Sequence, residues 1–148
     1  MRRIGIFLIL CVIATGFCFG QLPHTFTQYT SEDGLSQNTI MSILQDDKGV
    51  MWFATWDGLY KFDGYTFNNY KAHPGDSIGL SNNRLDNIKE DRYGYIWVQS
   101  YNHQVYRFNP RLERFQAIPY DNYLSLDMYV LPCGDVWIIT VQNELIHI

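Results

Sequence analysis

The 148-residue sequence has the length of one ordinary domain, and its composition, 47% hydrophobic and 18% charged, excludes an intrinsically disordered chain. Aromatic residues make up 16%, which favours sheet over helix because flat, stiff rings pack well on pleated surfaces. The formal net charge of −4 leaves no basic stripe, so nucleic acid and anionic membrane surfaces are not expected as partners.

The first 20 residues have the pattern of a secretory signal peptide. Arg2 and Arg3 precede an uncharged, mostly apolar run over residues 4–19, and Gly20 offers a small residue for cleavage. A membrane anchor needs about 20 apolar residues, and this run is shorter. We therefore expect export to the periplasm and a mature chain of residues 21–148, with retention of the segment as an anchor as the alternative.

Export would change the cysteine count and the charge of the mature chain. Two of the three cysteines lie in the signal segment, so Cys133 stays alone and no internal disulfide is expected. Loss of Arg2 and Arg3 makes the mature chain more acidic. This charge favours neutral or cationic small molecules, or proteins, as partners.

A repeat organises the mature chain. Three Gly-x-x-Trp anchors recur about every 40 to 45 residues, a period typical of propeller blades. The anchors are Gly49 and Trp52, Gly94 and Trp97, and Gly134 and Trp137. Because the three tryptophans share one repeat phase, we interpret them as core residues.

Each copy divides into short strands separated by turn residues. In the first copy, strands are expected at residues 39–45, 50–55, 59–62 and 66–70, with Asp-Gly or Asp-rich turns between them. The second strand of each copy is apolar on successive residues, which predicts burial on both faces, as in stacked blades. Hairpin connections make the strands antiparallel.

A four-stranded antiparallel sheet repeated radially is a β-propeller blade, so the predicted fold is all-β with an incomplete ring. Closure takes about 4–8 blades, which indicates a fragment of a longer propeller. The expected parts are a closing strand at residues 26–29, blade 1 at about 36–71, blade 2 at about 81–119 and a partial blade 3 at about 123–148.

These motifs resemble the two-component regulator propeller repeats in the periplasmic sensor region of bacterial hybrid histidine kinases. The resemblance rests on Asp46, Gly49, Met51-Trp52 and the strand Gly58-Leu59-Tyr60-Lys61-Phe62-Asp63, with an entry segment "SEDGLSQN". It implies a non-catalytic sensor module without a cofactor that recognises a glycan-derived or other small ligand. Its other partners would be the remaining blades, a second copy in a homodimer, and the membrane only through the parent protein.

The second copy departs from the family pattern. Residues 100–104 read Ser-Tyr-Asn-His-Gln where the family has Thr-x-x-Gly-Leu. Trp56 lies in a turn, in register with Tyr101, so Trp56, Tyr101 and Asn102 are the candidate ligand contacts; a packing role for Trp56 is the alternative.

No metal site or catalytic motif is predicted. The Asp-rich turns lack the spacing of a calcium loop, and the four histidines lack metal-ligand spacing. Carboxylates from different blades could still meet across a propeller channel. The alternative function is therefore the leading part of a secreted propeller enzyme of the lyase or hydrolase type.

Export predicts a defined mature terminus. Because the apolar run is too short for an anchor, N-terminal sequencing of the exported product should begin near Gln21. A product that starts at Met1 and sediments with membranes would show that the segment anchors the chain.

Overall fold

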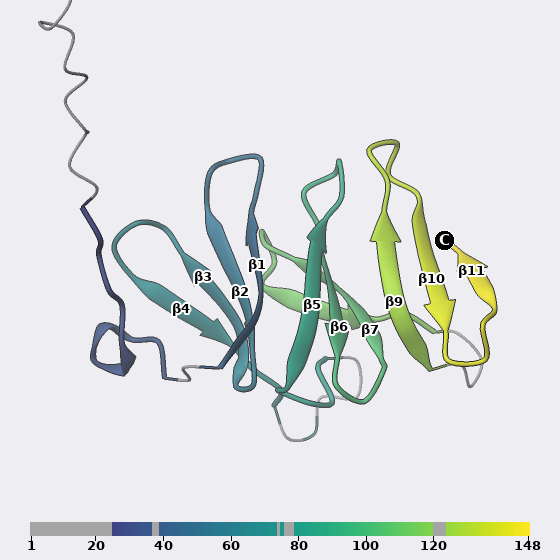
Figure 1. Cartoon of the computed structure of the whole chain (residues 1–148), viewed down its shortest axis with the longest axis horizontal. Coiled ribbons are helices and arrows are strands. Elements are labelled where there is room, and N and C mark those ends of the chain that lie inside the picture. Colours follow the sequence, from purple (N-terminus) through teal and green to yellow (C-terminus); the bar gives the residue numbers. More distant parts are fainter. Residues whose placement is uncertain (1–24, 37–38, 74, 76–78, 120–123) are drawn as a thin grey trace, which may run out of the picture.

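In the computed structural model, the described residues form eleven strands in three antiparallel sheets (Figure 1). The structure describes residues 25–36, 39–73, 75, 79–119 and 124–148. The predicted signal peptide lies outside the described residues, as do residues 37–38, 74, 76–78 and 120–123. Apart from the 3-10 turn η1 (Ser31–Asp33), the regular structure among the described residues is all strand.

The three sheets follow one another along the chain. Blade 1 contains β1 (Ile40–Gln45), β2 (Met51–Thr55), β3 (Gly58–Phe62) and β4 (Phe67–Tyr70). Blade 2 contains β5 (Leu85–Glu90), β6 (Ile96–Ser100), β7 (Val105–Asn109) and β8 (Arg114–Ala117). Blade 3 contains β9 (Ser125–Val130), β10 (Val136–Thr140) and β11 (Leu145–His147).

The arrangement confirms propeller blades in an open ring. Within each sheet the strands pair in chain order, and the sheets lie side by side in Figure 1. The first strand of blade 2, β5, contacts the first strands of both neighbours, β1 and β9. The first strands therefore lie on the inner side, as expected for blades around a common axis.

The segment before blade 1 differs from expectation. Residues 26–29, predicted as a lone closing strand, carry no strand in the structure. The Tyr29 ring instead packs edge-on against Phe62 and Phe67, with centroids 5.0 and 5.6 Å away. A strand needs a neighbouring strand for its backbone hydrogen bonds, and the described blades supply none for residues 26–29. Pairing of these residues with the last blade of a closed ring stays a prediction.

The first hairpin of each blade turns on a glycine, as the repeat predicts. Gly49, Gly94 and Gly134 have φ values of 81°, 78° and 101°, a left-handed conformation that residues with a side chain rarely adopt. The anchor tryptophan lies on the second strand of each blade, three residues after this glycine.

An aspartate at the start of the turn binds the anchor tryptophan. In blade 2, Asp91 Oδ1 accepts the backbone N–H groups of Tyr93 and Tyr95 at 2.9 and 3.1 Å, and Oδ2 accepts the indole N–H of Trp97 at 2.8 Å. Asp91 and Trp97 are buried. The carboxylate therefore ties the turn to the middle of the sheet.

Blade 1 repeats this arrangement and blade 3 does not. Asp46 Oδ2 accepts the indole N–H of Trp52 at 2.9 Å. The corresponding residue in blade 3 is Leu131, which has no acceptor. Trp137 is half-buried there and stacks on His147, with ring centroids 4.4 Å apart.

Each buried tryptophan packs on the following blade. The Trp52 ring meets Phe108 of β7 edge-on at 5.7 Å, and Trp97 lies in a cluster with Met128, Val136 and Ile138 of blade 3. Blade 2 has a neighbour on both sides, and β6 is buried at every position, as predicted. In β2 and β10, buried residues alternate with partly buried ones, because each of these blades has one neighbour among the described residues.

The buried carboxylate of Asp91 should contribute more to the free energy of unfolding than the exposed carboxylate of Asp63, which accepts similar backbone hydrogen bonds. Replacing Asp91 with Ala leaves the indole N–H and two backbone N–H groups unpaired, which should cost roughly 1–3 kcal/mol of unfolding free energy. Asp63 is the matched control, because its carboxylate also accepts two backbone N–H groups but is exposed. Asp63→Ala should cost less than about 1 kcal/mol. Urea unfolding of the complete protein measures both; equal costs would contradict this role for Asp91.

Residues 21–148 alone should not form a stable soluble monomer. Strand β11 is the edge of its sheet, and apolar side chains on the first and third blades are exposed, namely Met41, Ile43, Leu126, Tyr129 and Leu145. Uncapped terminal repeats and open edges promote aggregation. Expression of this segment with measurement of size and melting tests the expectation. A soluble monomer with a sharp transition would contradict it.

Candidate functional site

Two turns from neighbouring blades place the predicted contact residues at one end of the blades. Trp56 lies in the β2–β3 turn, and Tyr101 lies in the β6–β7 turn. The backbone N–H of Tyr101 donates to the carbonyl of Arg84, just before β5, at 2.9 Å. This bond fixes the β6–β7 turn against the segment that enters blade 2.

The first of these turns requires a glycine. Gly58 has a φ of 111°, and a Cβ added there would come within 2.5 Å of the Tyr70 carbonyl oxygen. His103 occupies the matching position in blade 2 with a φ of 64°. The departure from the family pattern is therefore accommodated by a histidine in the left-handed conformation, and its Nδ1 lies 2.9 Å from the Ser125 carbonyl oxygen of the next blade.

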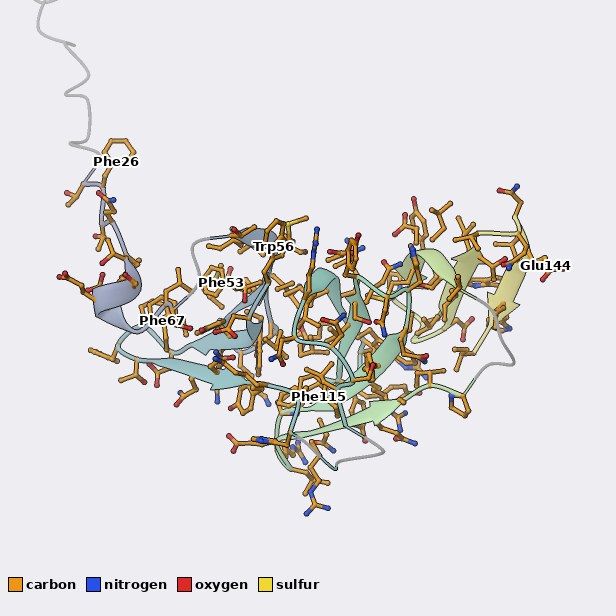
Figure 2. The ribbon with its side chains drawn as sticks, turned by 90° about the horizontal axis from the view of Figure 1, so that it is seen from below. Phe26, Phe53, Trp56, Phe67, Phe115 and Glu144 are labelled. Atoms are coloured by element: carbon orange, nitrogen blue, oxygen red, sulfur yellow. The ribbon has the colours of Figure 1, made fainter. Side chains whose placement is uncertain are left out.

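Trp56 and Tyr101 enclose an arginine that sequence reasoning did not select. The Arg84 guanidinium carbon lies 4.1 Å from the Trp56 ring centroid and 3.8 Å from the Tyr101 ring centroid. Both rings stay largely accessible, with exposed fractions of 42% and 52%, and Trp56 lies at the edge of the molecule in Figure 2. We name these three residues the aromatic–arginine stack.

Asn102 lies beside the stack and is held by its own blade. Its Oδ1 accepts from the Ser100 hydroxyl at 2.5 Å, and its Nδ2 donates to the Ser81 hydroxyl at 3.2 Å. Ser81 in turn lies 2.6 Å from the Tyr106 hydroxyl. An amide keeps hydrogen-bonding capacity beyond these two bonds, so Asn102 is an oriented, exposed polar group.

The carboxylate nearest in sequence to the stack is already occupied. Asp57 Oδ2 accepts from Lys71 Nζ at 2.6 Å and from the Ser36 hydroxyl at 2.7 Å. Partial burial would raise the pKa of Asp57, but these bonds outweigh burial and lower it. Asp57 therefore stays ionised at neutral pH, and Lys71 balances its charge.

Arg84 is where the repeat is broken by a long cationic side chain. The positions in register with it are Thr39 in blade 1 and Leu124 in blade 3. This irregularity is the sequence signal that could have identified Arg84. Its contact with two other turns could not be read from the sequence.

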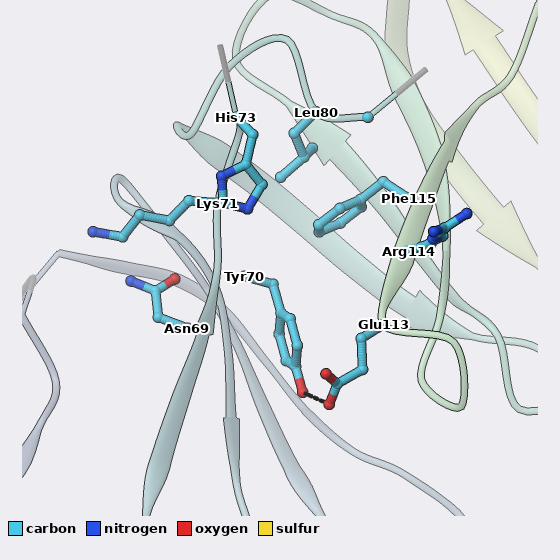
Figure 3. A pocket seen from close by; sticks show the side chains of 9 residues that line it. Asn69, Tyr70, Lys71, His73, Leu80, Glu113, Arg114 and Phe115 are labelled. Carbon is cyan, nitrogen blue, oxygen red and sulfur yellow. Dashed lines mark hydrogen bonds between the residues drawn. The ribbon is translucent and has the colours of Figure 1, made fainter. Parts of the chain in front are cut away.

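A second candidate site is a cavity between the outer strands β4 and β8. It has a volume of about 440 Å³, and Tyr70, His73 and Phe115 are among the residues that line it (Figure 3). The Tyr70 hydroxyl donates to Glu113 Oε1 at 2.8 Å. Burial, with this carboxylate, raises the pKa of Tyr70, so the phenol stays protonated at neutral pH. The cavity contains none of the predicted contact residues.

The described residues contain neither a candidate metal cluster nor a candidate membrane-spanning helix. No group of three or more His, Cys, Asp or Glu side chains in the described part of the chain could hold a metal ion. The same part contains no helix that is long and apolar enough to cross a membrane.

The fold and repeats match a known class of propeller. The family model "Two component regulator propeller" matches residues 34–57. Histidine kinase P4 of Formosa agariphila is 40% identical over 83 residues, which cover 55% of this chain and 6% of that protein. The predicted resemblance is confirmed at residues 34–57, which match the two-component regulator propeller model.

Solved structures show the same fold. The extracellular domain of a putative hybrid two-component system of B. thetaiotaomicron aligns with a TM-score of 0.67 and 23% identity, over 85% of this chain and 20% of that one. PorZ, a surface component of the type-IX secretion system of Porphyromonas gingivalis, aligns with a TM-score of 0.51 and 19% identity, over 69% and 15%. At these identities the likeness concerns the fold, and the chain spans a fifth or less of these proteins.

Proposed function

We propose that this chain forms the N-terminal blades of a periplasmic sensor propeller that binds a glycan-derived or other small ligand and carries out no catalysis itself. The observation that carries the proposal is the aromatic–arginine stack. Two accessible rings from adjacent blades converge on the guanidinium of Arg84 at one end of the blades.

The chemistry of the stack suits binding. Flat aromatic rings present apolar faces on which sugar rings stack, and Asn102 adds an oriented hydrogen-bonding group beside them. The groups nearby that could act as acid or base are engaged in structural contacts. Asp57 is bound by Lys71 and Ser36, and His103 Nδ1 lies against a backbone carbonyl oxygen.

The relatives support a role in signalling. One is a histidine kinase and another is the extracellular domain of a putative hybrid two-component system. We infer that the ligand acts on a signalling output elsewhere in the complete protein, and that the remaining blades, and a second copy in a homodimer, are the partners of this segment.

Removal of either exposed ring should weaken ligand binding. Trp56→Ala and Tyr101→Ala each delete one stacking face, and we expect about a tenfold loss of affinity, which corresponds to ~1.4 kcal/mol. Tyr65→Ala is the control, since Tyr65 is exposed in the β3–β4 turn, outside the two turns that form the stack. Calorimetric titration of the complete protein with a panel of oligosaccharides is the measurement. A panel without any binding or ligand-linked stabilisation would contradict the proposal.

A further inference from the structure

We propose that Arg84 forms an oxyanion subsite, so that the ligand bound at the stack carries a carboxylate, sulfate or phosphate group. This inference rests on the proposed function and defines the ligand class further. An acidic oligosaccharide, with a stacking sugar face and a charged substituent, combines the two kinds of contact that the stack offers.

The two rings contact the guanidinium of Arg84 through their faces and accept no hydrogen bond from it. The guanidinium carbon lies over the Trp56 ring at 4.1 Å and over the Tyr101 ring at 3.8 Å from the ring centroids. The N–H donors of arginine lie in the plane of the guanidinium, in a fork that matches the two oxygens of an oxyanion. Stacking therefore orients the fork without consuming its hydrogen bonds.

The side chain of Arg84 has no acceptor within the described part of the chain. No described residue accepts a hydrogen bond from it, and its Nε is buried without a partner. The ion pair of Lys71 with Asp57 involves another cation, and the remaining candidate pair among the described residues, His147 with Asp135, is an ion pair only when the imidazole is protonated. A positive charge held partly out of water without a counter-charge attracts an anion strongly, because the local dielectric is lower than in bulk water.

The subsite is also preorganised. The Arg84 backbone N–H donates to Asn82 Oδ1 at 2.8 Å, and its carbonyl accepts from the Tyr101 N–H at 2.9 Å. These bonds fix the backbone of Arg84, and the two rings hold its guanidinium at the other end of the side chain. Little side-chain entropy remains to be lost on binding, which favours affinity.

Arg107 shows what an arginine with a purely structural role looks like in this chain. Its guanidinium carbon lies 4.6 Å from the Tyr95 ring centroid, and Nη2 donates to Gln116 Oε1 at 2.9 Å. Arg107 therefore has one aromatic face and an acceptor for its edge. Arg84 contacts two aromatic rings and has no side-chain acceptor among the described residues, which is the difference that points to a ligand.

The experiment compares acidic and neutral probes on the complete protein. Calorimetry would use oligogalacturonides as the carboxylate arm, with carboxyl-reduced oligogalacturonides as their neutral counterpart. Sulfated and phosphorylated oligosaccharides form the sulfate and phosphate arms, each with its unsubstituted parent as the neutral counterpart. We expect at least one acidic arm to bind about tenfold or more tightly than its neutral counterpart, and the stronger arm identifies the anion. Raised salt should weaken this binding.

Variants then test whether Arg84 causes the preference for acidic over neutral probes. Arg84→Met should lose about tenfold in affinity for the acidic probe and bind neutral and acidic probes alike, whereas Arg84→Lys should keep part of the preference. Arg107→Met is the matched control and should leave both affinities unchanged. Melting temperatures of all variants report separately on packing between the blades.

The outcomes separate the two proposals. Equal binding of neutral and acidic probes, weakened by Trp56→Ala, would overturn the oxyanion subsite and leave the binding function standing. A lower melting temperature for Arg84→Met with unchanged preference for acidic probes would assign Arg84 to packing alone and overturn the subsite. Failure of every probe to bind, in wild type as well as variants, would count against both. If Arg84→Met does not fold, the comparison of probes on wild type still decides.

Discussion

The hydrogen bond from the anchor indole to the turn carboxylate links the shape of each blade to the packing between blades. Asp91 holds the N–H of Trp97 while the ring of Trp97 lies against blade 3. Burial of one such ring removes ~150–250 Å² from water, worth about 4–6 kcal/mol at 25 cal/mol per Å². The carboxylate positions this surface, so loss of the bond affects both the turn and the blade interface. Trp137 lacks the aspartate and is less buried.

Because blades 1 and 2 are anchored in the same way, residues at equal repeat phase reach the same end of these two blades. The framework can therefore hold different side chains at these positions without a change in fold. Trp56 and Tyr101 occupy one such phase, and Arg84 occupies another, where blade 1 has Thr39 and blade 3 has Leu124. The candidate site arises where blade 2 departs from the repeat next to the Trp56 turn of blade 1.

The sequence predicted the four strands of blade 1 to within a residue at each end, because Asp and Gly turns mark the hairpins. Residues 26–29, which were also predicted as a strand, carry none in the structure. Repeat phase also predicted that Trp56 and Tyr101 correspond. It could not predict Arg84 between them, since that contact joins three separate segments and depends on the side-chain conformations. Nor did it predict how His103 replaces a glycine, which depends on a left-handed backbone that His tolerates better than β-branched residues.

The acidic composition of the chain favours a neutral or cationic ligand, whereas the proposed Arg84 subsite favours an anionic group. These two expectations are compatible because of where the negative charges lie. Asp46 and Asp91 bind indole and backbone N–H groups, and Asp57 is paired with Lys71, so these negative charges are engaged within the blades. Charges farther away act across solvent and are screened over about 8 Å at physiological ionic strength. A ligand at the stack therefore responds first to the group it touches, and that group is the guanidinium of Arg84.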